Sequence, residues 1–158
     1  MPSAYIETSI VSYLTARPSP SPLVAAWQEM TVSWWNHQRR DFDLCTSALV
    51  IEEASRGDPE AAERRMAHLE GISLLAASDQ VIEFAGRLVH PGPLPIGAAD
   101  DAFHIALSAV HAVDYLLTWN FKHIDNALIK PRIRVLCTEH GHPCPEICTP
   151  QEMIGDLL

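Results

Sequence analysis

Residues 114–124 read DYLLTWNFKHI, and this stretch decides how the rest of the chain is interpreted. Its apolar residues end abruptly at the polar turn 118–120, Thr-Trp-Asn, and Lys122 and His123 follow directly. A short apolar run bounded by turn residues is typical of a buried strand. The sequence therefore predicts a strand over 114–119 with polar side chains at its carboxyl end.

Similar short apolar runs alternate with helical patterns along the whole chain. We expect further strands at 3–6, 42–47, 72–78 and 146–149. Helices are expected at 8–16, 23–40, 48–57, 58–71, 79–90, 98–113 and 150–158, whereas 131–141 fits a short helix or an extended piece. This alternation predicts one α/β domain over residues 1–158, with a mostly parallel sheet and helices on its faces.

Two local features of these helices can be predicted in more detail. Thr8 or Ser9 is available as the N-cap of the first helix, because hydroxyl side chains satisfy the free N–H groups there. The second helix is rich in large apolar side chains, and we expect these to pack inward at least in part: Trp27, Met30, Val32, Trp34 and Trp35.

Composition sets limits on the class of protein. The chain has 158 residues, 47% of them hydrophobic, and a net charge of −9. That length and content suffice for a buried core, whereas the negative charge argues against broad, nonspecific binding of nucleic acid. No apolar run approaches the roughly 20 residues that span a bilayer, and the start MPSAYIETSI does not resemble a signal peptide. We therefore expect a cytoplasmic protein with no membrane segment.

The four cysteines allow one metal hypothesis. Residues 137–148, CTEHGHPCPEIC, place three cysteines near two histidines, and zinc uses such ligands. The spacing matches no paired CxxC pattern, so a zinc site formed by Cys137, His140, His142 and Cys144 is the weaker interpretation. Cys45 and Cys148 lie in strand-like runs, where a buried thiol is the expected role.

Acidic and amide side chains lie at or near the carboxyl ends of the predicted strands. Glu7 follows the first strand and Asn120 the fourth, while Glu52–Glu53 and Asp100–Asp101 lie on adjoining helices. Ligand sites in open parallel sheets lie at this end of the sheet. Crowded carboxylates repel one another unless a cation compensates them, and oxygen ligands suit Mg²⁺ or Mn²⁺. Such a site is suited to phosphodiester hydrolysis.

Each of these residues also has an ordinary structural explanation. Acidic side chains are favoured at helix N-termini, and Asn is a common turn residue. His104, three residues after Asp101 on the same side of the helix, is more often a hydrogen-bonded structural histidine than a ligand. The functional interpretation therefore depends on the joint pattern.

Five motifs in order resemble the PIN-domain family, and within it the VapC-like toxins of type II toxin–antitoxin systems. They are YIETSIVSYL, SALVIEEASRG, DDAFHIALSAV, DYLLTWNFKHI and ICTPQEMI, and together they cover almost the whole chain. The second motif of the family has its acid four residues before a Gly, so Glu53 and not Glu52 matches the motif acid. The third motif likewise matches Asp101 and not Asp100.

This resemblance implies a compact α/β/α fold of three layers around a central sheet of four to five strands. It also implies metal-dependent cleavage of RNA, a homodimer, and an antitoxin protein that blocks the acidic pocket. The residues implied are Glu7, Glu53, Asp101 and Asn120 as catalytic, Glu7 and Asp101 as ligands of Mg²⁺ or Mn²⁺, and Thr118 and Lys122 as RNA-binding. Arg56 and His123 are further candidates for contact with the RNA backbone.

Two positions depart from the family pattern, and they leave alternatives open. Glu7 and Asn120 both stand where Asp is commoner, so the pocket would hold three acids with retuned metal binding. One alternative is a catalytically weakened module that binds RNA or a protein. Another is a receiver-type signalling domain, which fits poorly because Asp79 opens a helix instead of ending a central strand.

Overall fold

The strands of the protein lie side by side in one parallel sheet. The computed structural model of the chain describes residues 1–154. The strands in this part are β1 (Ser3–Ile6), β2 (Asp43–Ser47), β3 (Ser73–Leu75), β4 (Tyr115–Leu117) and β5 (Glu146–Cys148). Their order in the sheet is β3-β2-β1-β4-β5. The predicted α/β class is confirmed, and the sheet is parallel throughout.

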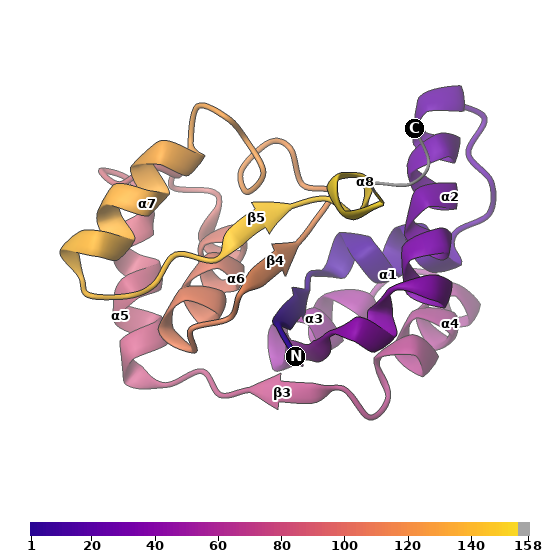
Figure 1. Cartoon of the computed structure of the whole chain (residues 1–158), viewed down its shortest axis with the longest axis horizontal. Helices are drawn as coiled ribbons and strands as arrows, with labels where there is room; N and C mark the ends of the chain where they lie inside the picture. The colour runs from indigo at the N-terminus through magenta and orange to yellow at the C-terminus, as the bar shows by residue number, and fades with distance from the viewer. Residues whose placement is uncertain (155–158) are drawn as a thin grey trace.

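Helices cover both faces of this sheet (Figure 1). The helices are α1 (Thr8–Thr15), α2 (Pro22–His37), α3 (Ala48–Ala54), α4 (Pro59–Leu69), α5 (Asp79–Leu88), α6 (Ala99–Val110), α7 (Lys130–Glu139) and α8 (Pro150–Met153). The chain adds strands outward from β1 to β3 and then returns to the other side of β1. Because parallel crossovers are right-handed, that reversal places α5–α7 on the face opposite α1–α4. The result is the expected three-layer α/β/α arrangement.

The central strands are buried because both of their faces are covered. In β1, Tyr5 pairs in register with Cys45 of β2 and with Leu116 of β4. These side chains are almost fully excluded from solvent and belong to one hydrophobic core. Near-continuous apolar runs, without alternation, are what such doubly covered strands require.

Several local predictions are corrected by the structure. Glu7, and not Thr8 or Ser9, is the N-cap of α1, because its carboxylate accepts the Ser9 amide. The second helix ends at His37, before a separate turn of 3-10 helix at Arg39–Asp41. Trp34 and Trp35 are buried as expected, but Val32 is 38% exposed.

At the C-terminal end of the chain, the open alternative at 131–141 is resolved as helix α7, which begins at Lys130. The last predicted helix, 150–158, is helical over Pro150–Met153, and its final four residues lie outside those described. Between residues 1 and 154, no helix is long and apolar enough to cross a membrane.

Candidate functional site

The strand order reverses direction between β1 and β4, and Glu7 lies where β1 ends at this point. Ligand sites of open parallel sheets form at such a switch point. The Thr118 hydroxyl, from the end of β4, donates to Glu7 Oε1 at 2.5 Å. The Ser9 hydroxyl and amide donate to the same carboxylate at 2.5 and 2.9 Å. Glu7 is only 6% exposed, so these donors offset the cost of burying its charge.

Glu53, on α3, belongs to a chain of hydrogen bonds that runs through His104 and Tyr5 to Ser47. Its Oε1 accepts from the Thr8 hydroxyl and pairs with His104 Nε2, both at 2.7 Å. The other ring nitrogen of His104 is 2.7 Å from the Tyr5 hydroxyl, which lies 2.7 Å from the Ser47 hydroxyl. Both nitrogens of this histidine, which is 1% exposed, are therefore paired.

The charges of three acids act on the buried His104, and one of these acids, Glu53, contacts it. Burial alone would lower the pKa of His104, but its hydrogen bond to Glu53 and the charges of Glu7, Glu53 and Asp101 outweigh burial and raise it. Burial likewise tends to raise the pKa of Glu53, yet the hydrogen bond and charge of His104 hold it below its ordinary value. Both shifts favour the charged forms, so protonation of His104 makes the two side chains an ion pair, in which the imidazolium donates to Glu53 and to Tyr5.

Asp101, at the start of α6, is held by two residues that follow β4. Its Oδ1 accepts from Asn120 Nδ2 at 3.0 Å, and its Oδ2 lies 2.8 Å from His123 Nδ1. The Oδ1 of Asn120 accepts the amides of Lys122 and His123 at 3.2 and 3.0 Å. Those two backbone donors require oxygen on that side, so Asn120 presents its N–H group to the site and turns its oxygen away.

The structure brings together most of the residues that the sequence singled out. Hydrogen bonds join Glu7, Thr118, Asn120 and Asp101 into one network at the carboxyl ends of β1 and β4. Glu53 belongs to a second network with Thr8 and His104, and the charges of all three acids act on His104. The Lys122 side chain is exposed, and only its backbone amide contributes to the network. Two other candidate RNA contacts already have partners: Arg56 pairs with Glu52 at 3.0 Å, and His123 with Asp101.

Sequence reasoning missed the polar residues that hold these acids. Ser9, Thr8, Tyr5 and Ser47 show no pattern that distinguishes them from capping or core residues. His104 offered one signal, its position three residues after Asp101 on the same face of a helix. That spacing indicated a shared side of the helix but could not identify Glu53, 51 residues away, as the partner.

The carboxylates at this site have the right chemistry for a divalent cation, but their arrangement fits one less well. Carboxylate oxygens are the ligands that Mg²⁺ and Mn²⁺ prefer. Among residues 1–154, however, no three His, Cys, Asp or Glu side chains are grouped so that they could hold a metal ion. The finding applies equally to the hypothetical zinc cluster, where His140 and His142 pack against the Phe84 ring. A cation at the acidic site would thus rely mainly on Glu7, Asp101 and solvent.

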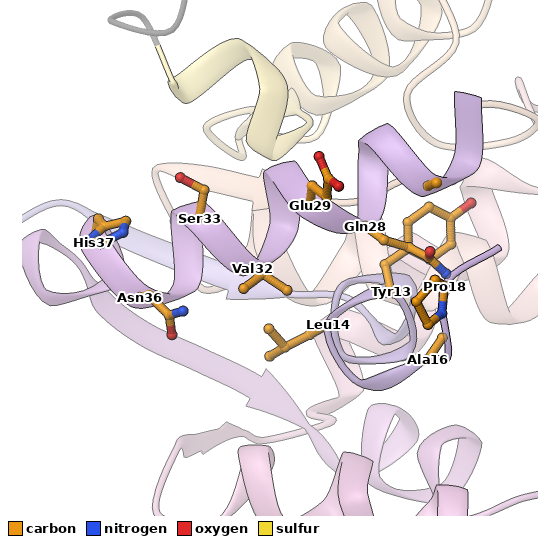
Figure 2. Close-up of a pocket in the computed structure, with 11 residues that line it drawn as sticks. Tyr13, Leu14, Ala16, Pro18, Gln28, Glu29, Val32, Ser33, Asn36 and His37 are labelled. Carbon is orange, nitrogen blue, oxygen red and sulfur yellow. The ribbon is translucent and has the colours of Figure 1, made fainter. Parts of the chain in front are cut away.

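Two hollows lie near this site without containing its principal acids. A groove of about 440 Å³ runs between α1 and α2, where Leu14 and Val32 face each other and Glu29 and His37 lie along the helix (Figure 2). A smaller, mostly apolar hollow of about 250 Å³ lies between α3 and α6, beside Glu52 and Asp100. Glu7, Glu53 and Asp101 are not among the residues that line either hollow.

Comparison with family models, curated proteins and solved structures found no match to this chain. Function is therefore inferred from the geometry of the site together with the order of the motifs. The fold and site define an α/β protein with an acidic centre at the switch point of a parallel sheet.

Proposed function

We propose that the protein is a metal-dependent endoribonuclease of the PIN-domain type, similar to VapC toxins, that hydrolyses RNA phosphodiester bonds. The observation that carries this proposal is the gathering of Glu7, Glu53 and Asp101 around His104 at the carboxyl ends of β1 and β4. The ordered set of motifs supports the same activity. An antitoxin protein and a second copy of the chain are the partners that accompany it.

The roles of the residues follow from their hydrogen bonds. Glu7 and Asp101 are the carboxylates that would hold Mg²⁺ or Mn²⁺. When bound, such an ion supplies an activated water and offsets the phosphate charge. Thr118 and Ser9 fix the Glu7 carboxylate, while Asn120 and His123 fix that of Asp101. Such positioning lets a site act without reorganising its dipoles during the reaction.

Charge balance explains the place of Glu53 and Lys122. Protonation of His104 offsets the charge of Glu53, and the site then carries less net negative charge towards a phosphate than three isolated acids would. The exposed Lys122 side chain lies two residues after Asn120 in sequence, where an ammonium group can meet the RNA backbone.

The direct test is cleavage of a mixed RNA pool with Mn²⁺, with Mg²⁺ and with EDTA. Asp101→Asn should reduce metal-dependent cleavage by roughly 100-fold or more, because it removes a charge at the reacting centre. Asp100→Asn is the matched control, since this neighbouring acid is exposed and outside the network. Equal cleavage by wild type and Asp101→Asn would contradict the assignment.

One observation favours a second candidate, a module that binds RNA or protein without cutting. Each of the three acids already accepts hydrogen bonds from the chain, and Asn120 presents N–H groups in place of an oxygen ligand. Calorimetric titration with MnCl₂ separates the two candidates. RNA binding with no Mn²⁺ binding and no cleavage would support the module.

A further inference from the structure

A groove between α1 and α4 concentrates positive charge in an otherwise acidic protein. It has a volume of about 460 Å³ and is lined by Arg17, Arg64 and Arg65, three of the 11 Lys and Arg residues in a chain of net charge −9. None of these arginines forms an ion pair with another side chain in residues 1–154. With Asp58 and Glu60 also in the lining, the groove carries a net charge of about +1, opposite in sign to that of the whole chain.

The two acids in the groove have a local role that explains their presence. Asp58 is the N-cap of α4, and its Oδ2 accepts the Ala61 amide at 3.0 Å. Glu60 lies in the first turn of the same helix, where the helix dipole favours an acid. Their charge is therefore partly offset by the helix itself.

Only one of the three arginines is needed by the fold. Arg65 donates to the carbonyls of Ala54 and Arg56 at 2.9 and 2.6 Å, and so supports the end of the helix that carries Glu53. Arg17 and Arg64 are exposed and have no such contact within the described chain. These two guanidinium groups are therefore free to meet an external anion.

The groove lies along the face of α1 that carries Thr8, a residue in contact with the acidic site. Thr8, whose hydroxyl donates to Glu53 at 2.7 Å, is followed by Ser12 and Thr15 at helical spacings of four and three residues. Residues at these spacings share a face, and Ser12 and Thr15 line the groove. At 1.5 Å per residue, this face extends about 10 Å from the site. The Thr8 and Thr15 hydroxyls already donate to Glu53 and to the Val11 carbonyl, which leaves Ser12 as the hydroxyl donor of this face among the described residues.

We propose that the α1–α4 groove binds the sugar–phosphate backbone of the RNA strand that enters or leaves the acidic site. The ligand follows from the proposed function, whereas the site follows from the groove's unpaired arginines and the Ser12 hydroxyl that lines the groove with them. Guanidinium and hydroxyl groups are donors that proteins use on phosphate oxygens. Such a groove lets an acidic protein bind a polyanion, because the electrostatic potential near a groove depends on nearby charges more than on the net charge of the protein.

The test measures binding without cleavage. Anisotropy of a fluorescein-labelled single-stranded RNA in EDTA would be followed for wild type, for Arg17→Ala/Arg64→Ala, and for the control Arg87→Ala/Arg132→Ala on α5 and α7. The groove variant should bind roughly 2- to 30-fold more weakly, as expected for two exposed charge pairs. The slope of log affinity against log salt should fall by about 1.4, the value for two lost contacts to a single strand. The control should match wild type.

Equal affinity of the two double variants would overturn the groove, as would a wild-type protein that binds no RNA. A labelled polyglutamate peptide that binds with RNA-like affinity and the same arginine dependence would assign the groove to an acidic protein and also overturn the proposal. Arginine-dependent RNA binding without cleavage in the metal assay would support RNA binding by the groove and contradict the proposed nuclease activity. The two proposals can therefore fail separately. Circular dichroism confirms that each variant is folded.

Discussion

The acidic site and the arginine groove both adjoin helix α1, but they differ in whether their charged groups have partners within the chain. Around Glu7, Glu53 and Asp101, every carboxylate is held by donors from the chain, and the buried His104 supplies a cation. In the groove, Arg17 and Arg64 have no anionic partner among residues 1–154. A charge that the fold satisfies contributes to stability, whereas one that it leaves unsatisfied on the surface is available to a ligand.

The largest effect should come from His104→Ala. Removing this cation leaves Glu53 without its charged partner and Tyr5 without one of its hydrogen-bond partners, in a region almost closed to solvent. Breaking a buried pair in this way costs about 3–5 kcal/mol. Urea unfolding measures the loss, with the exposed His37→Ala as control, for which a change within about 0.5 kcal/mol is expected. A variant as stable as that control would show that the His104–Glu53 pair contributes nothing.

A smaller loss is expected for Thr118→Val. The substitution keeps the shape of the side chain but removes a donor from the buried carboxylate of Glu7 and an acceptor from the Asn120 amide. Leaving a buried polar group unsatisfied costs about 1–3 kcal/mol. The exposed Thr138→Val, which loses only a hydrogen bond within α7, serves as the reference in thermal unfolding. Equal losses in both variants would mean that Ser9 alone supports Glu7.

Stability should also depend on pH through the same ion pair. Because the pKa of His104 is raised by folding, its contribution is complete below the unfolded value of about 6.5 and is lost as the pH rises through the folded value. The lowered pKa of Glu53 acts at the other end: its contribution is present above about 4.3 and disappears as the pH falls through the folded value. Urea unfolding across this range should show a plateau between the two losses.

The variant His104→Gln provides the control for this pH dependence. The glutamine side chain cannot titrate, so the loss of unfolding free energy on the alkaline side should vanish. The loss on the acidic side should become smaller. An unchanged alkaline decline in this variant would assign the titration to another group.

The smallest effect is expected in the groove. Arg64→Ala should change the free energy of unfolding by no more than about 0.5 kcal/mol, because the guanidinium has no partner to lose. Differential scanning calorimetry in low salt is the measurement, and a small gain is consistent with relief of repulsion from Arg17 and Arg65. A loss of 1 kcal/mol or more, on the order expected for a hydrogen bond to a charged group, would place Arg64 in the fold and weaken the contrast.

The fold and the candidate site differ in how far they could be predicted. Apolar runs and helical spacing are local, so they located the five strands and most of the helices correctly. The polar residues at strand ends also indicated the sheet edge where Glu7 and Asn120 lie. The N-cap of α1 was missed because Glu7 competes with two hydroxyl residues for that role, and only the position of the Ser9 amide decides between them.

Sequence patterns alone predict an α/β protein with an acidic edge, because the periodicity of side chains follows from the geometry of each helix and strand. Tertiary packing sets the strand order, the pairing of His104 with Glu53, the orientation of Asn120, and the placement of Arg17 and Arg64 in one groove. Each of these depends on elements far apart in the chain that pack together. Such contacts follow from the burial of shared apolar faces, and local spacing does not encode which faces meet.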